Sequence, residues 1–555
     1  MQTFIKKKSP LFIILLLLLF YGINNYIWLR FNQFPPNTDQ AGHLLSNLRY
    51  LDILTKPSWN ILSRLLKVDN FYPPFFPFCA AIVNIVFGHS AVISTMTNMI
   101  FAAILFISVY AIGLKYMNKS VGLFAVFIVS MYPYVFGLSR MFFLEFALTA
   151  VVCFCFCCLF HADNFQHRGY SILFGLAFGV GMLTKSTFIF FLIGPLIITI
   201  GNIFFNRSSK DKLKKVLINL GMAFIISCII GGSWYVSKLY DVVHKHCEYI
   251  RSPFFGPLNM PKSIIYYLNV LVLDQVAPFF IFVFMAGLVL LLKDKEKLKF
   301  LFVLLLWIVT PFIIFILLNV RFMYYTVPNL PAVALISSAG ILKIQRRQLK
   351  IFLVSAIVIV AIIQYYVISY TTPSSVKIRV SVPTSIEIRP SFLSEDVSFR
   401  FSSPCHIFPI GDSFYHFPRR GDWKLNDIIR IIEKNNSNHK SLSIGVTDAL
   451  IKGKRVSWLN QDSNELVTSW HDNFLIANKA AVEYAVRVRK LPYTVISLIN
   501  TEEYWTSYPI LDFIISVKKI EEIAPKVARY YECILQNTLP DGSLLYVYKK
   551  YELHA

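Results

Sequence analysis

Residues 170–204 read YSILFGLAFGVGMLTKSTFIFFLIGPLIITIGNIF, and Lys185 is the only charged side chain among them. A helix that crosses a bilayer needs about 20 apolar residues, so this run is too long for a single crossing. Lys185 lies near the middle of the run, within Thr184-Lys185-Ser186. The run therefore predicts two membrane helices that turn at Lys185.

Apolar stretches of spanning length recur on both sides of this hairpin. The chain of 555 residues is 56% apolar and 15% charged, whereas a soluble protein carries about 25% charged residues. This composition excludes an ordinary soluble enzyme and a disordered chain. Together with the hairpin, nine further stretches predict a polytopic α-helical membrane protein with about eleven spans; they lie at about 11–29, 91–113, 120–138, 146–161, 216–236, 276–292, 300–318, 326–342 and 351–370.

The basic residues indicate which ends of these helices face the cytoplasm. Residues 1–370 hold 31 Lys and Arg against 11 Asp and Glu, and many of the cations lie in short loops at 207–215, 293–299 and 343–350. These loops share one side if segment 73–88 lies in the opposite interface or re-enters the bilayer without crossing it. Because cytoplasmic loops are enriched in Lys and Arg, the sequence favours that arrangement. Cations between apolar runs also argue against a nucleic-acid partner.

This orientation places the N-terminus in the cytoplasm and most of the longer loops outside. The first apolar run is too long for a signal peptide and no small-residue cleavage site follows it, so it predicts a signal anchor. The segments expected outside are 30–90, 139–145, 185, 237–275, 319–325 and 371–555. Short basic cytoplasmic loops suit a bacterial inner (plasma) membrane, so any chemistry is expected at its outer face.

The last third of the chain differs from the rest in composition and in its hydrophobic pattern. Residues 371–422 are rich in proline and predict a linker after the membrane domain, residues 1–370. Within 423–555, strands expected at 442–446, 493–498, 513–517 and 544–548 alternate with helices expected at 426–433, 464–488 and 520–531. This alternation predicts a small extracytoplasmic α/β domain. It lacks a glycine-rich phosphate loop, so an accessory or acceptor-binding role is favoured over an independent catalytic one.

Two carboxylates on the expected outer side stand in special contexts. Asp39 opens a helical pattern that continues to about Leu54, where it is either a helix cap or a functional group. Glu145 is a lone acid at the end of a very apolar helix, and ionisable groups at membrane depth are functional candidates. Arg140 lies close before it, so a structural Arg–Glu pair is the alternative.

Cations also occur on the expected outer side, although Lys and Arg are generally enriched in cytoplasmic loops. Lys185 interrupts the apolar hairpin, and Arg321 opens Arg321-Phe322-Met323-Tyr324-Tyr325. Such cations either extend their charged ends toward water or bind an anion at the interface. A phosphate at the level of the lipid headgroups is the natural anion, and a guanidinium group can bind it through two hydrogen bonds.

Five motifs in this part of the chain occur in a characteristic order. They are Asp39, Tyr72-Pro73-Pro74-Phe75-Phe76-Pro77, Arg140 with Glu145, Gly175–Lys185, and Arg321-Phe322 followed by Pro328-Asn329-Leu330-Pro331. Over about residues 15–342 this order resembles the GT-C superfamily of polyprenyl-phosphate-sugar-dependent glycosyltransferases, and within it the protein O-mannosyltransferase and lipid A aminoarabinose transferase branch. The family's first motif is usually Asp-Glu, and Gln40 here replaces the Glu.

The resemblance implies a transferase that moves a sugar from a polyprenyl-phosphate donor to an acceptor hydroxyl, with inversion, at the outer face of the membrane. It implies Asp39 as the general base, with Glu145 positioning the acceptor or sharing that role. It also implies donor-phosphate contacts, for which the candidates are Arg321, Lys185 and Arg140. Substrate-lining candidates are His43, Tyr72 and Tyr324, although His43 also fits a polar surface residue and the tyrosines fit interfacial anchors.

Several alternatives stay open on the sequence alone. No cofactor is implied; a divalent metal is compatible with the pattern but not required by it. The acceptor is a protein hydroxyl, a lipid A or a cell-wall glycan. A transporter or flippase of lipid-linked sugars is the second function class, since it would share basic interfacial residues and apolar grooves.

Overall fold

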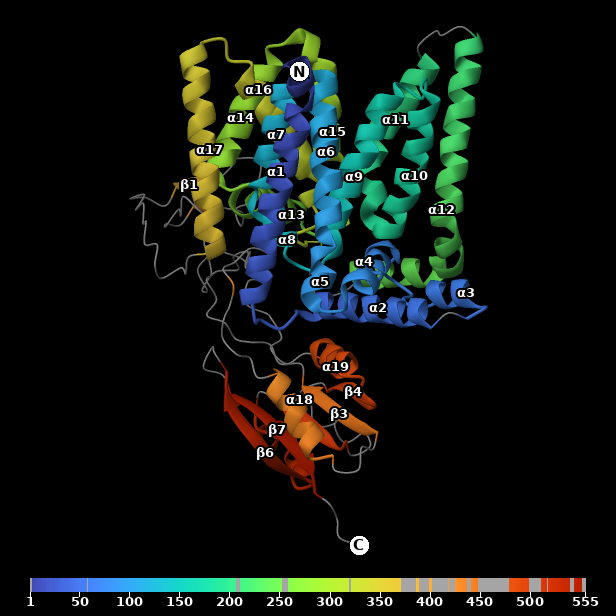
Figure 1. Cartoon of the computed structure of the whole chain (residues 1–555), viewed down its shortest axis with the longest axis vertical. Coiled ribbons are helices and arrows are strands. Elements are labelled where there is room, and N and C mark those ends of the chain that lie inside the picture. Colours follow the sequence, from blue (N-terminus) through green and yellow to red (C-terminus); the bar gives the residue numbers. More distant parts are fainter. Residues whose placement is uncertain are drawn as a thin grey trace. The chain divides into compact units, whose positions relative to one another are not determined.

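The structure is a computed structural model of the chain. It describes residues 2–56, 58–205, 210–251, 258–318, 321–370, 386–388, 399–401, 418, 425–436, 441–447, 479–498, 511–516, 518–539 and 544–551. Two compact units are formed (Figure 1). The first comprises residues up to Ile27 together with the chain from Tyr50 through the last membrane helix. The second comprises Trp28–Arg49 and the described residues of the α/β domain.

The first unit is built from helices. In chain order the structure has α1 (Gln2–Phe31), α2 (Thr38–Thr55), α3 (Ile61–Leu66), α4 (Phe75–Phe87), α5 (Ala91–Met96), α6 (Asn98–Tyr116), α7 (Lys119–Ser130), α8 (Pro133–Leu138), α9 (Leu144–Ala162), α10 (Arg168–Thr184), η1 (Ser186–Phe188), α11 (Ile189–Phe205), α12 (Lys210–Arg251), α13 (Met260–Asn269), η3 (Val270–Gln275), α14 (Pro278–Leu292), η4 (Lys295–Lys297), α15 (Leu298–Leu317), η5 (Val327–Asn329), α16 (Leu330–Leu342) and α17 (Arg347–Tyr370). A two-stranded antiparallel pair, β1 (Ile386–Ile388) with β2 (Phe399–Phe401), follows.

The polytopic helical fold is confirmed, but the count of eleven spans is not. Among the described residues, seven helices are long and apolar enough to cross a bilayer. An eighth span arises if the pair Met260–Gln275 and Pro278–Leu292, which is bent by 108°, is counted as one. All eleven predicted segments are helical, yet α7, α10 and Val327–Leu342 fall in the shorter class of 10–17 residues. The chain is an integral membrane protein with several helices shorter than a full crossing.

Proline explains why one predicted span is broken. The stretch 120–138 was expected to form a single helix, but α7 ends at Ser130 and α8 begins at Pro133. Proline lacks an amide hydrogen and disfavours helical geometry in the residue before it, so a new helix begins at this position.

Glycines allow several helices of the first unit to approach closely. A side chain on Gly340 of α16 would collide with the backbone of Gly287 on α14. Conversely, a Cβ atom on Gly287 would lie 2.8 Å from the carbonyl oxygen of Ile336. Gly113 of α6 and Gly122 of α7 approach in the same way, with 2.6 Å between a Cβ on Gly113 and the Cα of Gly122. Small residues at such crossings are the usual way in which membrane helices gain close van der Waals contact.

The second unit contains the predicted α/β domain. Its described elements are α18 (Leu425–Lys434), β3 (Leu442–Thr447), α19 (Lys479–Val488), β4 (Tyr493–Leu498), β5 (Phe513–Ser516), α21 (Ile520–Ile523), α22 (Pro525–Ala528), β6 (Tyr531–Thr538) and β7 (Leu544–Lys550). The strands form one sheet in the order β4-β3-β5-β7-β6. β3 is parallel to β4 and β5, whereas β7 is antiparallel to β5 and β6.

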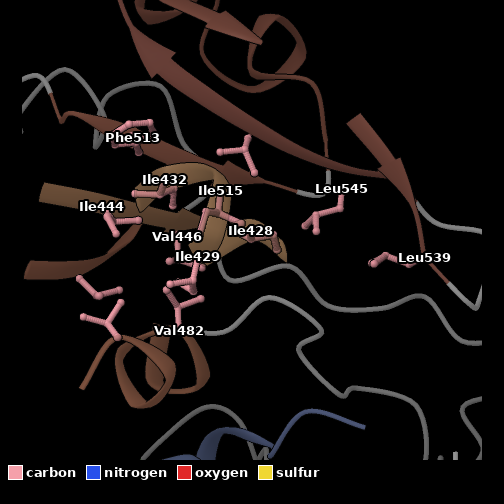
Figure 2. Close-up of a cluster of buried hydrophobic side chains, with 13 residues drawn as sticks. Ile428, Ile429, Ile432, Ile444, Val446, Val482, Phe513, Ile515, Leu539 and Leu545 are labelled. Atoms are coloured by element: carbon pink, nitrogen blue, oxygen red, sulfur yellow. The ribbon is translucent and has the colours of Figure 1, made fainter. Parts of the chain in front are cut away.

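Alternate residues of the strands face two different cores. Ile515 and Val547 join the isoleucines of α18 and the valines of α19 in one apolar cluster (Figure 2). Their neighbours Ile514 and Tyr548 face the other side, where they meet α21 and α22. This alternation is the two-residue period of a strand covered on both faces.

Most of the elements predicted for this domain are present, with one error. Residues 520–531 were expected to be helical, but Tyr531 begins the edge strand β6. The side chains of β6 are mostly exposed or half-buried and include Glu532, Gln536 and Asn537, so the sequence shows no regular apolar alternation there. The first part of the expected helix 464–488 and most of the linker 371–422 lie outside the described residues.

We expect Gly340→Ala to lower the thermal unfolding midpoint of the purified protein, because the added methyl group would push α16 away from α14. Overpacking of this kind typically costs about 1–3 kcal/mol. Gly232→Ala in α12 is the matched control, since nothing lies within 4 Å of a Cβ placed there. An unchanged midpoint for Gly340→Ala, measured by a thermal shift assay in detergent, would contradict the close helix contact.

Candidate active site

A buried ion pair joins two of the predicted site residues. Lys185 Nζ donates a hydrogen bond to Glu145 Oε1, and the two residues are 8% and 2% exposed. Glu145 lies in the first turn of α9, where the positive end of the helix dipole faces its carboxylate. A buried carboxylate is costly without compensation, so the lysine and the helix terminus both make this position tolerable.

The turn at the end of α10 brings Lys185 to this place. Lys185 caps α10 in an extended conformation, and its amide donates to the carbonyl of Gly181 at 3.2 Å. The chain then folds back through η1, which lays the ring of Phe188 directly over Gly181, where any side chain would collide with it. The predicted turn of the apolar hairpin is therefore present and is held tightly at Lys185.

Two tyrosines cover the ammonium group. Lys185 Nζ lies 4.6 Å from the ring centre of Tyr325 and 5.4 Å from that of Tyr324. Tyr324 in turn contacts Phe143, the residue that precedes α9, at 5.5 Å between ring centres. Cations over tyrosine rings are attracted to the electron-rich face, and the attraction increases when water is excluded. The structure thus brings together the predicted residues Glu145, Lys185 and Tyr324, and it adds Tyr325.

One oxygen of this cluster has spare hydrogen-bonding capacity. Glu145 Oε2 is buried and has no hydrogen-bond partner among the described residues. Buried polar atoms are nearly always paired, so each exception needs an explanation. A polar group of a bound molecule would satisfy this oxygen, which is what a carboxylate that positions an acceptor hydroxyl requires.

Arg140 does not belong to this cluster. Its guanidinium donates to Asn25 Oδ1 at 3.0 Å, to Ser369 Oγ at 2.8 Å and to the Tyr365 hydroxyl at 2.6 Å. It is 3% exposed, and these bonds join the segment after α8 to α1 and α17. The alternative of a structural Arg140–Glu145 pair is not what the structure has, since Glu145 pairs with Lys185. Phosphate binding by Arg140 stays a prediction that these partners do not favour.

Arg321 is half-buried in the segment that precedes η5. Burial lowers the pKa of its guanidinium from the usual value, and the neighbouring Tyr266 and Tyr267 act in the opposite direction. Arginine remains charged in proteins, so the group still presents a cation beside tyrosine side chains. This setting is compatible with the predicted phosphate contact.

Tyr72 lies in a short loop that precedes α4. Asp69 Oδ1 accepts hydrogen bonds from the amides of Phe71 and Tyr72, each at 2.8 Å, which fixes the turn. The ring of Phe71 contacts His246 of α12 at 5.2 Å between centres, and His246 Nε2 lies 3.2 Å from Ser186 Oγ. Ser186 directly follows Lys185. The sequence did not indicate His246, because its contacts join segments that are far apart in the chain.

Asp39 and His43 lie in the second unit. The sequence allowed Asp39 to be a helix cap and His43 to be a surface residue, and neither alternative is found. The cap of α2 is formed by Asn37, whose Oδ1 accepts from the Gln40 amide at 2.8 Å, while Gln40 Oε1 accepts from the Asn37 amide at 3.3 Å. This reciprocal pair is a capping box, so Asp39 is an exposed residue of the first turn and not the cap. His43 is 4% exposed, so its interpretation as a surface residue is wrong.

The described residues hold no group of three or more His, Cys, Asp or Glu side chains placed to bind a metal ion.

Residues 72–234 match the family model described as dolichyl-phosphate-mannose-protein mannosyltransferase. No curated protein matches the chain. Among solved structures, the chain is similar to ArnT from Cupriavidus metallidurans, with 14% identity, a TM-score of 0.46 and 64% of each chain covered. It is also similar to the oligosaccharyltransferase of Archaeoglobus fulgidus in complex with zinc and sulfate, with 13% identity, a TM-score of 0.49 and coverage of 95% of this chain and 72% of that one.

The fold and the cluster define an integral membrane protein with a buried carboxylate–lysine pair at the ends of two helices. The family match covers Tyr72, Glu145 and Lys185 but ends before Tyr324 and Tyr325. Over residues 72–234 the chain is thus similar to this mannosyltransferase family, in agreement with the resemblance that the motifs indicated. It spans less than two thirds of the length of ArnT.

We expect removal of either partner of the Glu145–Lys185 pair to destabilise the protein. Breaking a buried pair by removing one member typically costs about 3–5 kcal/mol, because the other charge stays buried. Lys185→Met should therefore unfold at a lower temperature than wild type, whereas the double variant Glu145→Gln/Lys185→Met should recover much of the loss. Additive losses in a thermal shift assay would show that the two groups do not interact.

Proposed function

We propose that the protein is a glycosyltransferase that moves a sugar from a polyprenyl-phosphate donor to an acceptor hydroxyl at the outer face of the membrane. The observation that carries the proposal is the buried Glu145–Lys185 pair, with its unsatisfied carboxylate oxygen, inside the stretch that matches a dolichyl-phosphate-mannose-dependent family. The basic loops support an orientation with the N-terminus in the cytoplasm, in a bacterial inner membrane.

The proposed reaction is a single displacement at the anomeric carbon. Asp39 accepts the proton of the acceptor hydroxyl, whose oxygen then forms the new glycosidic bond. The bond from the anomeric carbon to the phosphate oxygen breaks, and the polyprenyl phosphate leaves with the electron pair. One displacement inverts the configuration of the sugar.

Cations stabilise the charge that develops on the leaving phosphate. Lys185 has three N–H donors, of which one is directed to Glu145, so it can contact a phosphate without leaving its partner. Arg321 is the second candidate and can donate two parallel hydrogen bonds. Glu145 uses its unsatisfied oxygen to orient the acceptor, and Tyr72 and Tyr324 line the sugar.

We expect Asp39→Ala to lose most of the transfer activity, because a positioned general base contributes about 10²–10⁴-fold to the rate. The assay follows transfer of radiolabelled sugar from extracted polyprenyl-phosphate sugars to envelope material of the same cells. Asp52→Ala on the same helix is the matched control, since Asp52 is an exposed residue paired with Lys56. Asp39→Ala protein that transfers as fast as wild type would refute this base.

The same preparation separates the transferase from the transporter. Movement of the lipid-linked sugar across vesicle membranes, without formation of a new glycosidic bond, would replace the proposal by the flippase alternative.

We expect Arg321→Ala to raise the KM for the donor by about 10-fold, the effect of losing roughly 1.4 kcal/mol of phosphate binding. Arg321→Lys should recover only part of this affinity, because an ammonium group cannot bind phosphate through two parallel bonds. Arg346→Ala serves as the control, since this arginine is exposed in a basic loop. Donor titration measures the effect, and equal KM values for Arg321→Ala and Arg346→Ala would exclude a phosphate contact.

A further inference from the structure

We propose that the C-terminal α/β domain acts as a positioning module for the segment that carries Asp39, an inference that rests on the proposed function. Trp28–Arg49 belongs to the same compact unit as the α/β domain, although the two are separated by the whole membrane domain in the sequence. The proposed base therefore lies on a segment that the accessory domain holds.

The segment contacts the α/β domain on the N-terminal side of Asp39. Phe34 packs against the apolar cluster formed by α18, α19 and the sheet. The members of that cluster are almost fully buried, among them Ile429 at 0% and Val482 at 1% exposed. An aromatic side chain that joins such a cluster removes a large apolar area from water and has a defined orientation.

The segment also contacts the domain on the C-terminal side of Asp39. Arg49 Nη2 lies 3.9 Å from Glu483 Oε1 on α19, and Glu483 is held in turn by Arg487 Nε at 3.2 Å. A partly exposed pair of this length contributes little free energy, about 0–1 kcal/mol. Phe34 is therefore the main contact of the segment with the domain, and Arg49 is a second, weaker contact.

Most of the segment between the two contacts is helical. The Asn37–Gln40 capping box defines the first turn of α2, in which Asp39 lies. Ala41, Leu44 and Leu45 are buried on the following turns. A displacement at Phe34, four residues before the start of α2, would therefore shift the Asp39 carboxylate in this proposal.

Position matters strongly for a general base. A misplacement of about 1 Å can cost 10²-fold in rate, whereas binding of a donor that contacts other residues is little affected. Phe34 is a positioning residue in this scheme. Loss of its contact lowers kcat and leaves the KM for the donor nearly unchanged.

The test compares Phe34→Ala, Phe34→Leu and Trp59→Ala in the full-length protein. Trp59 is a large aromatic residue that is 99% exposed, so its removal controls for the loss of an aromatic side chain. Two quantities are measured: the steady-state kinetics with varied donor, and amide hydrogen exchange in peptides that cover 38–49. For Phe34→Ala we expect kcat to fall about 10-fold with the donor KM within about two-fold, and exchange in 38–49 to rise. Phe34→Leu should recover both, and Trp59→Ala should change neither.

The outcomes distinguish this inference from the function on which it rests. Unchanged exchange and kcat in Phe34→Ala would overturn the inference, as would faster exchange at an unchanged kcat, since the domain would then not position the base. If wild-type protein transfers no sugar while exchange still depends on Phe34, the proposed function fails and only the contact of the domain with the segment is supported. If Phe34→Ala does not fold, Phe34→Val replaces it, since it removes the ring and keeps an apolar side chain, and the same outcomes for kcat and exchange apply.

Discussion

The buried pair of Glu145 and Lys185 is the constraint around which the membrane unit is arranged. A carboxylate and an ammonium group can both be buried only if they stay in contact. The start of α9 must therefore remain beside the end of α10, and the turn after α10 must be tight. Gly181 permits that turn because the ring of Phe188 occupies the place of a side chain. The segment 321–325 completes the site with two tyrosines over the lysine.

The sequence was informative where a single physical rule determined the outcome. Length and the isolated charge of Lys185 were sufficient to predict the helical hairpin, and alternation of strands and helices was sufficient for the α/β domain. The partner of Glu145 was not predicted: Arg140, the alternative considered, is near in sequence, while Lys185 is near only in the fold. Arg140 instead joins α1 and α17 through Asn25 and Ser369, contacts that no local pattern reveals.

The start of α2 shows how two local rules can compete. Asn37 and Asp39 are both favoured caps, so residue type alone does not decide between them. Gln40 selects Asn37 as the cap, because the two residues exchange hydrogen bonds between side chain and backbone amide. Asp39 is then a residue of the first turn. Glutamine serves in a capping box as well as glutamate does. The replacement of the family's second acid at this position therefore keeps the helix start while it removes a charge beside Asp39.

The environments of the two carboxylates favour different roles for them. Both lie in the first turn of a helix, where the dipole attracts negative charge. Glu145 is buried and bonded to Lys185, so its carboxylate is held in one orientation. A group in that position is suited to hold a hydroxyl in place. Asp39 is exposed, so a substrate hydroxyl in solution can reach its carboxylate. This difference in burial, more than the order of the motifs, favours Asp39 as the base and Glu145 as the residue that orients the acceptor.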